Sequence, residues 1–196
     1  MNRGKGRAIQ YWRHPFFKFT QGRGELSVAV NMMHVGLLTA IAAILQSAGG
    51  YAPGIGFLVS TMATFPIFLA TVASVRYGFL SYLVAIFLLL FIQPSELFIF
   101  PFTTGILGLV LGALFHKARF FVVFWSGTAL FMGIAALLFV IRFPVLGPGI
   151  GSSFDFALLL VMAAFSLLYA WAAAEACAYV LKRLGRIIQP VSGRRE

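Results

Sequence analysis

One uncharged stretch indicates the fold class: residues 120–141 read FFVVFWSGTALFMGIAALLFVI. The stretch contains no proline and shows no alternation of apolar and polar side chains. A helix of about 20 apolar residues crosses the hydrocarbon core of a bilayer. A continuous apolar stretch of this length is typical of a transmembrane helix, whereas a strand of a membrane β-barrel would alternate.

Five more apolar stretches lie before and after this one, and glycine, proline or basic residues separate them, as expected at helix ends. We therefore expect an all-α integral membrane protein with six transmembrane helices. The predicted helices cover residues 27–48, 55–75, 78–92, 96–115, 120–141 and 155–181. The predicted parts of the chain are a basic and aromatic arm (1–26), a transmembrane domain (27–182) and a basic tail (183–196).

The composition agrees with this interpretation. Of the 196 residues, 61% are apolar and 10% are charged. Soluble domains usually contain about 45–50% apolar and about 25% charged residues. The chain therefore has too little polar surface to cover a water-soluble globule, which excludes a soluble enzyme, a disordered chain and a fibrous repeat.

Basic residues are placed unevenly along this chain of net charge +10. If both termini are cytoplasmic, the arm, the residues from Lys182 onward and the turns at Arg76 and at 117–119 hold every Lys and Arg except Arg142. Cytoplasmic loops are enriched in Lys and Arg, so we predict an even number of spans with both termini inside. Anionic lipid is the expected partner of these cations, and nucleic acid is not, because no RNA-binding motif accompanies the arm.

Polar residues gather at the predicted outward ends of the helices. In a compact bundle they would meet at one mouth, where a small solute would find hydrogen-bond partners and charges of both signs. The alternative is ordinary helix capping and a salt bridge at the membrane interface. The residues concerned are Gln46, Ser47, Tyr51, Gln93, Ser95, Glu96, Arg142, Ser152, Ser153 and Asp155.

Small residues form a stripe on the first predicted helix, where Gly36, Ala40 and Ala43 are spaced to share one helical face. Small residues let helices approach closely in lipid. The stripe therefore predicts either packing within the chain or docking on a partner membrane protein. Gly105, Gly108 and Gly112 repeat the feature on the fourth helix.

The second predicted helix contains Pro66 near its middle, with Ser60, Thr64, Thr71 and Ser74 along one side. Proline removes a backbone hydrogen bond and bends a helix, while neighbouring hydroxyls can satisfy the freed backbone groups. A structural kink is the favoured interpretation, and the lining of a cavity is the alternative.

His34 and Glu175 fall toward the cytoplasmic ends of the first and sixth predicted helices. At similar depth they could form a proton relay. We favour structural pairing of Glu175 with Arg76 or Arg119, because ionisable side chains near helix ends reach toward the interface.

Signatures of enzymes fail one by one. The chain has no Gly-x-Ser-x-Gly elbow and no His-Glu-x-x-His helix. Three His and a single Cys leave no metal constellation. The glycine-rich residues 147–152 are not followed by the lysine of a phosphate-binding loop. We therefore expect neither an enzyme nor a bound metal or cofactor.

The pattern resembles the substrate-binding S components of energy-coupling factor transporters. The resemblance rests on six short helices, the basic N-terminal arm, the first helix reading LLTAIAAIL (37–45) and the fourth ending GILGLVLGALFHK (105–117). The stretches Phe-Pro-Ile at 65–67 and Arg-Tyr-Gly at 76–78 are similar to the YybS-like branch of that superfamily. The likeness covers roughly residues 27–182.

The resemblance implies an S-component-like bundle in a bacterial plasma membrane that captures a vitamin or other micronutrient near the outer face. Such proteins dock on a transmembrane coupling protein that carries two ATPases. The docking surface of the family corresponds here to Gly36, Ala40 and Ala43. The pocket of the family implicates the side chains of Gln46, Tyr51, Gln93, Glu96, Arg142 and Asp155.

A second interpretation is a non-transporting membrane scaffold or assembly protein of the cell envelope. In this interpretation the chain resembles the small membrane proteins of the cell-shape machinery. A scaffold predicts stable partners at the cytoplasmic face and no small-molecule ligand.

Overall fold

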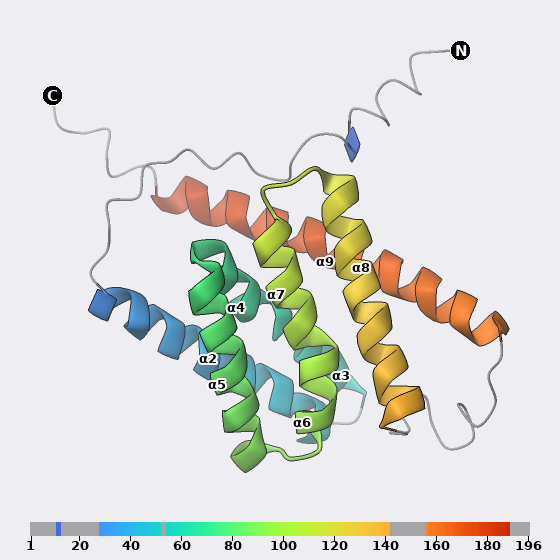
Figure 1. Cartoon of the computed structure of the whole chain (residues 1–196). Helices are drawn as coiled ribbons and strands as arrows, with labels where there is room; N and C mark the ends of the chain where they lie inside the picture. The colour runs from blue at the N-terminus through green and yellow to red at the C-terminus, as the bar shows by residue number, and fades with distance from the viewer. Residues whose placement is uncertain (1–10, 13–27, 52–53, 142–155, 189–196) are drawn as a thin grey trace, which may run out of the picture.

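The computed structural model describes residues 11–12, 28–51, 54–141 and 156–188 (Figure 1). Within these ranges the chain is helical and contains no strand. The elements are α2 (Val28–Tyr51), α3 (Ile55–Thr61), α4 (Thr64–Ala73), α5 (Val75–Ile92), α6 (Glu96–Ile99), the 3-10 helix η1 (Phe100–Phe102), α7 (Thr104–Leu114), α8 (Arg119–Ala135), the π-helical turn η2 (Ala136–Val140) and α9 (Phe156–Ile188).

The prediction of six spans is confirmed for the described residues. Six helical segments are long and apolar enough to cross a membrane. They are Val30–Tyr51, Ile55–Ala73, Val75–Ile92, Glu96–Leu114, Arg119–Val140 and Phe156–Arg183. The orientation of these spans in the bilayer stays a prediction from the basic residues.

The second span is broken near its middle, as Pro66 predicts. The helix changes from α3 to α4 at Met62 and Ala63, the residues four and three positions before the proline. The amides of Met62, Ala63 and Phe65 bond to carbonyls three residues earlier, each at 3.0 Å. These tighter bonds satisfy the backbone where proline cannot donate its own.

The fourth span contains a second break, which the sequence analysis did not predict. Its helix is interrupted by η1, which contains Pro101, and by Thr103, which departs from helical geometry at φ −123° and ψ −97°. Helix α8 packs against this break at Gly133, where a Cβ atom would lie 1.8 Å from the carbonyl oxygen of Phe102. Glycine is therefore required at this crossing.

Two apolar cores hold the bundle together. One lies among α4, α7, α8 and α9 and includes Phe68, Leu111 and Phe115, with the rings of Phe68 and Phe115 edge to face at 4.8 Å. The other lies among α2, α4, α5 and η1, and Leu89 and Phe100 are fully buried in it. Packing of this kind, together with dispersion contacts, is the main source of helix association in lipid.

The glycines of the fourth span pack within the chain. A Cβ atom at Gly108 would lie 2.7 Å from the carbonyl oxygen of Thr64, and one at Gly112 would lie 2.9 Å from that of Phe68. Both glycines therefore let the backbones of α4 and α7 touch. The small residues of α7 therefore serve packing within the chain, which is one of the two roles predicted for such stripes; the other was docking on a partner protein.

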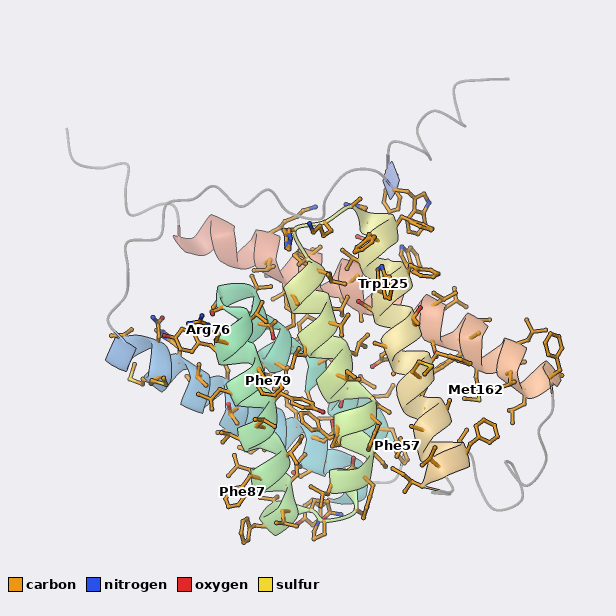
Figure 2. All side chains as sticks on the ribbon, viewed as in Figure 1. Phe57, Arg76, Phe79, Phe87, Trp125 and Met162 are labelled. Atoms are coloured by element: carbon orange, nitrogen blue, oxygen red, sulfur yellow. The ribbon has the colours of Figure 1, made fainter. Side chains whose placement is uncertain are left out.

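Apolar side chains cover most of the outer surface. Figure 2 shows Phe57, Phe79, Phe87 and Trp125 projecting away from the helices that carry them, and all four are exposed. Among the spans of the described residues, α9 is the most exposed, and it crosses behind α7 and α8 (Figure 1). A bilayer is the solvent that such a surface suits.

Candidate functional site

Three polar side chains meet inside the bundle at the end where α6 begins. Gln46 comes from the last turns of α2, Glu96 is the first residue of α6, and Thr104 is the first residue of α7. The Thr104 hydroxyl donates to Gln46 Oε1 at 2.7 Å, and Gln46 Nε2 donates to Glu96 Oε2 at 2.7 Å. The exposed fractions of Gln46, Glu96 and Thr104 are 1%, 4% and 8%.

We call these residues the Gln46–Glu96–Thr104 cluster. Its local structure follows from the breaks in the fourth span. Helix α7 begins anew after η1, which places Thr104 at a helix start and opposite α2. The cluster therefore joins α2, α6 and α7 through two side-chain hydrogen bonds.

Charge is the unusual feature of this cluster. Within the described ranges the one ion pair is formed by Arg119 and Glu175, so Glu96 has no cationic partner there. An ionised carboxylate away from water is costly unless a cation or several hydrogen-bond donors compensate it. Ionisable residues in this situation are the first candidates for a functional site in a membrane protein.

Backbone glycines close over the cluster. A Cβ atom at Gly49 would lie 2.8 Å from Glu96 Oε1 and 3.3 Å from the Cβ of Ser60. A Cβ atom at Gly50 would lie 2.0 Å from Gln93 Nε2. The last turn of α2 thus packs directly on the carboxylate, and only glycine fits there without displacing a polar side chain.

The predicted outward residues are only partly brought together. Gln46 and Glu96 make direct contact. Gln93 donates to Ser95 at 3.0 Å at the rim, outside the cluster itself. Tyr51 is 67% exposed, and its hydroxyl donates to the carbonyl oxygen of Ile92 at 3.0 Å.

Four of the predicted residues, Arg142, Ser152, Ser153 and Asp155, lie outside the described residues. Conversely, the sequence analysis missed Thr104. The signal available for it was Pro101, since a proline inside a span indicates a new helix start shortly afterwards, where a threonine side chain can face inward.

The predicted docking stripe of α2 is divided by the fold. Gly36 is exposed, and no atom would lie within 4 Å of a Cβ placed there. Ala40 is half-buried, whereas Ala43 is fully buried in the core that α2 shares with α4 and α5. Ala43 therefore packs within the chain, and the open part of the stripe is centred on Gly36.

A second polar contact on α2 lies deeper in the bundle. The hydroxyls of Thr39 and Ser81 are 2.7 Å apart, and the Thr39 hydroxyl also lies 2.7 Å from the carbonyl oxygen of Val35. Both side chains are buried. This neutral contact joins α2 to α5 and provides a matched comparison for the charged cluster on the same helix.

At the opposite end of the bundle, Tyr11, Arg119, Trp171 and Glu175 form another polar cluster. Arg119 Nη1 lies 2.7 Å from Glu175 Oε1, which confirms the predicted pairing of Glu175 with a basic residue. The Tyr11 hydroxyl also donates to Glu175 and accepts from Trp171 Nε1 at 3.2 Å. The guanidinium of Arg119 stacks on the Tyr11 ring, with the Cζ atom 4.2 Å from the ring centroid.

This arrangement favours the structural interpretation of Glu175. His34 Nδ1 lies 2.8 Å from the carbonyl oxygen of Val30 in its own helix, while Glu175 is engaged by Arg119 and Tyr11. Tyr11 belongs to the predicted basic arm, so this contact ties the arm to α8 and α9. The Arg119 guanidinium interacts there with both the Glu175 carboxylate and the face of the Tyr11 ring.

Metal-binding geometry is not found in the part of the chain that the structure describes, where no three His, Cys, Asp or Glu side chains gather. The Gln46–Glu96–Thr104 cluster offers a single carboxylate, an amide and a hydroxyl. Such a set can hold a small polar or charged group. Comparison with known proteins adds no family: no family model, curated protein or solved structure matches this chain.

Proposed function

We propose that this protein is the substrate-capturing membrane subunit of an uptake transporter of the energy-coupling factor type. It would bind a micronutrient or vitamin near the outer face of the plasma membrane. The observation that carries the proposal is the buried Gln46–Glu96–Thr104 cluster at one end of the bundle, where no cation of the described residues pairs with the carboxylate. Polar groups are retained at such depth mainly where a function needs them.

The predicted topology supports an extracellular position for this cluster. With both termini in the cytoplasm, Glu96 begins its span at the outward side and Arg119 begins the next span at the inward side. A solute arriving from outside would then reach Glu96 after displacing the last turn of α2. Basic residues at the inward side would contact anionic lipid.

A transporter of this kind needs an energy source outside the chain, because the sequence carries no phosphate-binding loop. We propose a transmembrane coupling protein with ATPase subunits as the partner. The exposed surface around Gly36 and Ala40 on α2 is its proposed docking surface, since small residues permit close approach of a second helix.

Mass spectrometry of the full chain, gently purified from its native membrane, tests this proposal. We expect a stoichiometric small metabolite, a coupling protein and ATPases to be recovered together. Gln46→Leu should lose the metabolite and still insert, because it removes the central hydrogen-bonding group of the cluster. Thr39→Val, the matched change on the same helix, should retain it.

A membrane scaffold of the cell envelope is the second candidate, and the closed packing of Gly49 and Gly50 on polar side chains favours it. A scaffold uses the cluster only to join α2, α6 and α7. Recovery of cell-envelope proteins, with no metabolite from either wild type or Thr39→Val, would support the scaffold and contradict solute capture.

A further inference from the structure

We propose that the captured solute carries a positive charge, and that Glu96 is its counter-charge. The chemical class is an organic ammonium ion, such as a protonated or quaternary amine. This inference rests on the proposed function and narrows it, because it predicts which solutes the site accepts and which it rejects.

The first argument is the direction of the hydrogen bonds. The Thr104 hydroxyl occupies Gln46 Oε1, so the amide presents its N–H group to Glu96 Oε2. The chain of donors ends on the carboxylate and offsets part of the cost that burial imposes on its ionised form. One amide donor compensates only part of a buried negative charge, so a cation at this position would be stabilised.

The second argument is the helix end that lies against Glu96. Gly49 packs on Glu96 Oε1, and α2 ends two residues later at Tyr51. The last four carbonyl groups of a helix lack partners inside the helix, and together they carry a partial negative charge. The Glu96 carboxylate and the C-terminus of α2 are therefore both negatively charged and adjacent. Their combined field favours a bound cation and disfavours an anion.

The composition of the site favours an organic cation over a metal ion. Divalent calcium and magnesium are held by several oxygen ligands, commonly more than one carboxylate, or by water. The cluster provides one carboxylate, one amide and one hydroxyl. A single carboxylate matches the single charge of an ammonium group better than the charge of a divalent ion.

Thermal unfolding of the purified full chain in detergent, followed by tryptophan fluorescence, provides the test. The probes are butylammonium and tetraethylammonium, compared with uncharged butanol and anionic butyrate at equal ionic strength. We expect the two cations to raise the unfolding temperature of the wild type, and butanol and butyrate to have no comparable effect. In Glu96→Gln the affinity for the cations should fall roughly 10- to 100-fold, because a charged partner is lost.

Two variants keep the result interpretable. Glu96→Asp retains the charge and should retain a cation-dependent shift, even where Glu96→Gln unfolds. Thr39→Val should respond as the wild type does. An equal response of Glu96→Gln and wild type, an equal effect of butyrate, or no cation response in wild type would each overturn the inference.

The metabolite identified by mass spectrometry separates this inference from the proposed function. A neutral or anionic metabolite that co-purifies with the wild type would leave solute capture standing and overturn the cationic class. The absence of any metabolite, with envelope proteins recovered instead, would contradict the proposed function itself.

Discussion

Glu96 and Glu175 show how one bundle accommodates two acidic side chains in different ways. Glu175 is paired with Arg119 and bonded by Tyr11, so its charge is compensated locally. Glu96 is buried, and among the described residues its one side-chain donor is Gln46. A charge that its neighbours compensate is consistent with a role in structure, whereas a carboxylate without a described cationic partner is the feature from which the solute class is inferred.

Breaking the Arg119–Glu175 pair should destabilise the fold. The side chains are 13% and 35% exposed, intermediate between a surface pair and a buried one. We therefore expect Glu175→Gln to lower the free energy of unfolding by about 1–3 kcal/mol. Unfolding of Arg119→Gln, Glu175→Gln and the double variant forms a double-mutant cycle. Strictly additive losses would show that the pair contributes nothing.

Helix breaks place the candidate site, because the interrupted fourth span is what turns Thr104 toward Gln46. The same interruption brings α8 against the backbone at Gly133. Helix α9 makes a different contribution: its 33 residues extend about 50 Å at 1.5 Å per residue, longer than a bilayer core of about 30 Å. Such a helix must tilt or project beyond the hydrocarbon.

Two glycine substitutions should separate close packing from helix propensity. Gly133→Ala places a Cβ atom 1.8 Å from the Phe102 carbonyl oxygen, so we expect a loss of stability of about 3 kcal/mol or a shift of α8. Gly36→Ala meets no atom within 4 Å and removes a flexible residue from α2. It should leave stability unchanged or raise it by about 0.5–1 kcal/mol. Thermal unfolding in detergent compares the two, and similar losses would contradict the described packing.

The whole molecule combines a lipid-facing apolar surface with polar clusters at opposite ends. Glu96 begins one span and Arg119 begins the next, so the two clusters lie near opposite ends of neighbouring spans. Under the proposed function, solute would enter at the end of the bundle that carries the Gln46–Glu96–Thr104 cluster. Tyr11 contacts Arg119 and Glu175 at the other end.

The orientation can be measured by cysteine labelling in intact cells. Cys177 is the single cysteine and is 1% exposed, so the wild type serves as the unlabelled control. With both termini inside, Ser95→Cys should react with a membrane-impermeant maleimide added outside, because Ser95 is exposed at the turn before α6. His116→Cys should react only after the membrane is opened. The reverse pattern would invert the topology and remove the extracellular site.

Features encoded by residues close together in the chain could be predicted from the sequence. Continuous apolar stretches predicted the six spans, and Pro66 predicted the kink. Gln46 and Glu96 both lie at predicted outward helix ends, so their proximity could be predicted too. Helical periodicity placed Gly36 and Ala43 on one face, but the packing of α2 left the first exposed and buried the second. Periodicity shows which residues share a helix face, but the tertiary structure determines how much of that face the neighbouring helices cover.

Contacts between remote residues were beyond such reasoning. Tyr11 reaches Glu175 across 164 positions, and no local pattern indicates that pairing. Thr104 was hidden for another reason: it is one of several hydroxyl residues near Pro101, and its inward position depends on how η1 ends. The solute-binding and docking roles of these residues stay predictions.

The pairing of Arg119 with Glu175 also has a consequence for how the protein is made. Ribosomes complete Arg119 well before Glu175, so this ion pair can form only after the last helix has been made. Tyr11 can stack on that cation early, but the counter-charge arrives only with the last helix. The tie between α8 and α9 at this end of the bundle is therefore completed only when the last helix is in place.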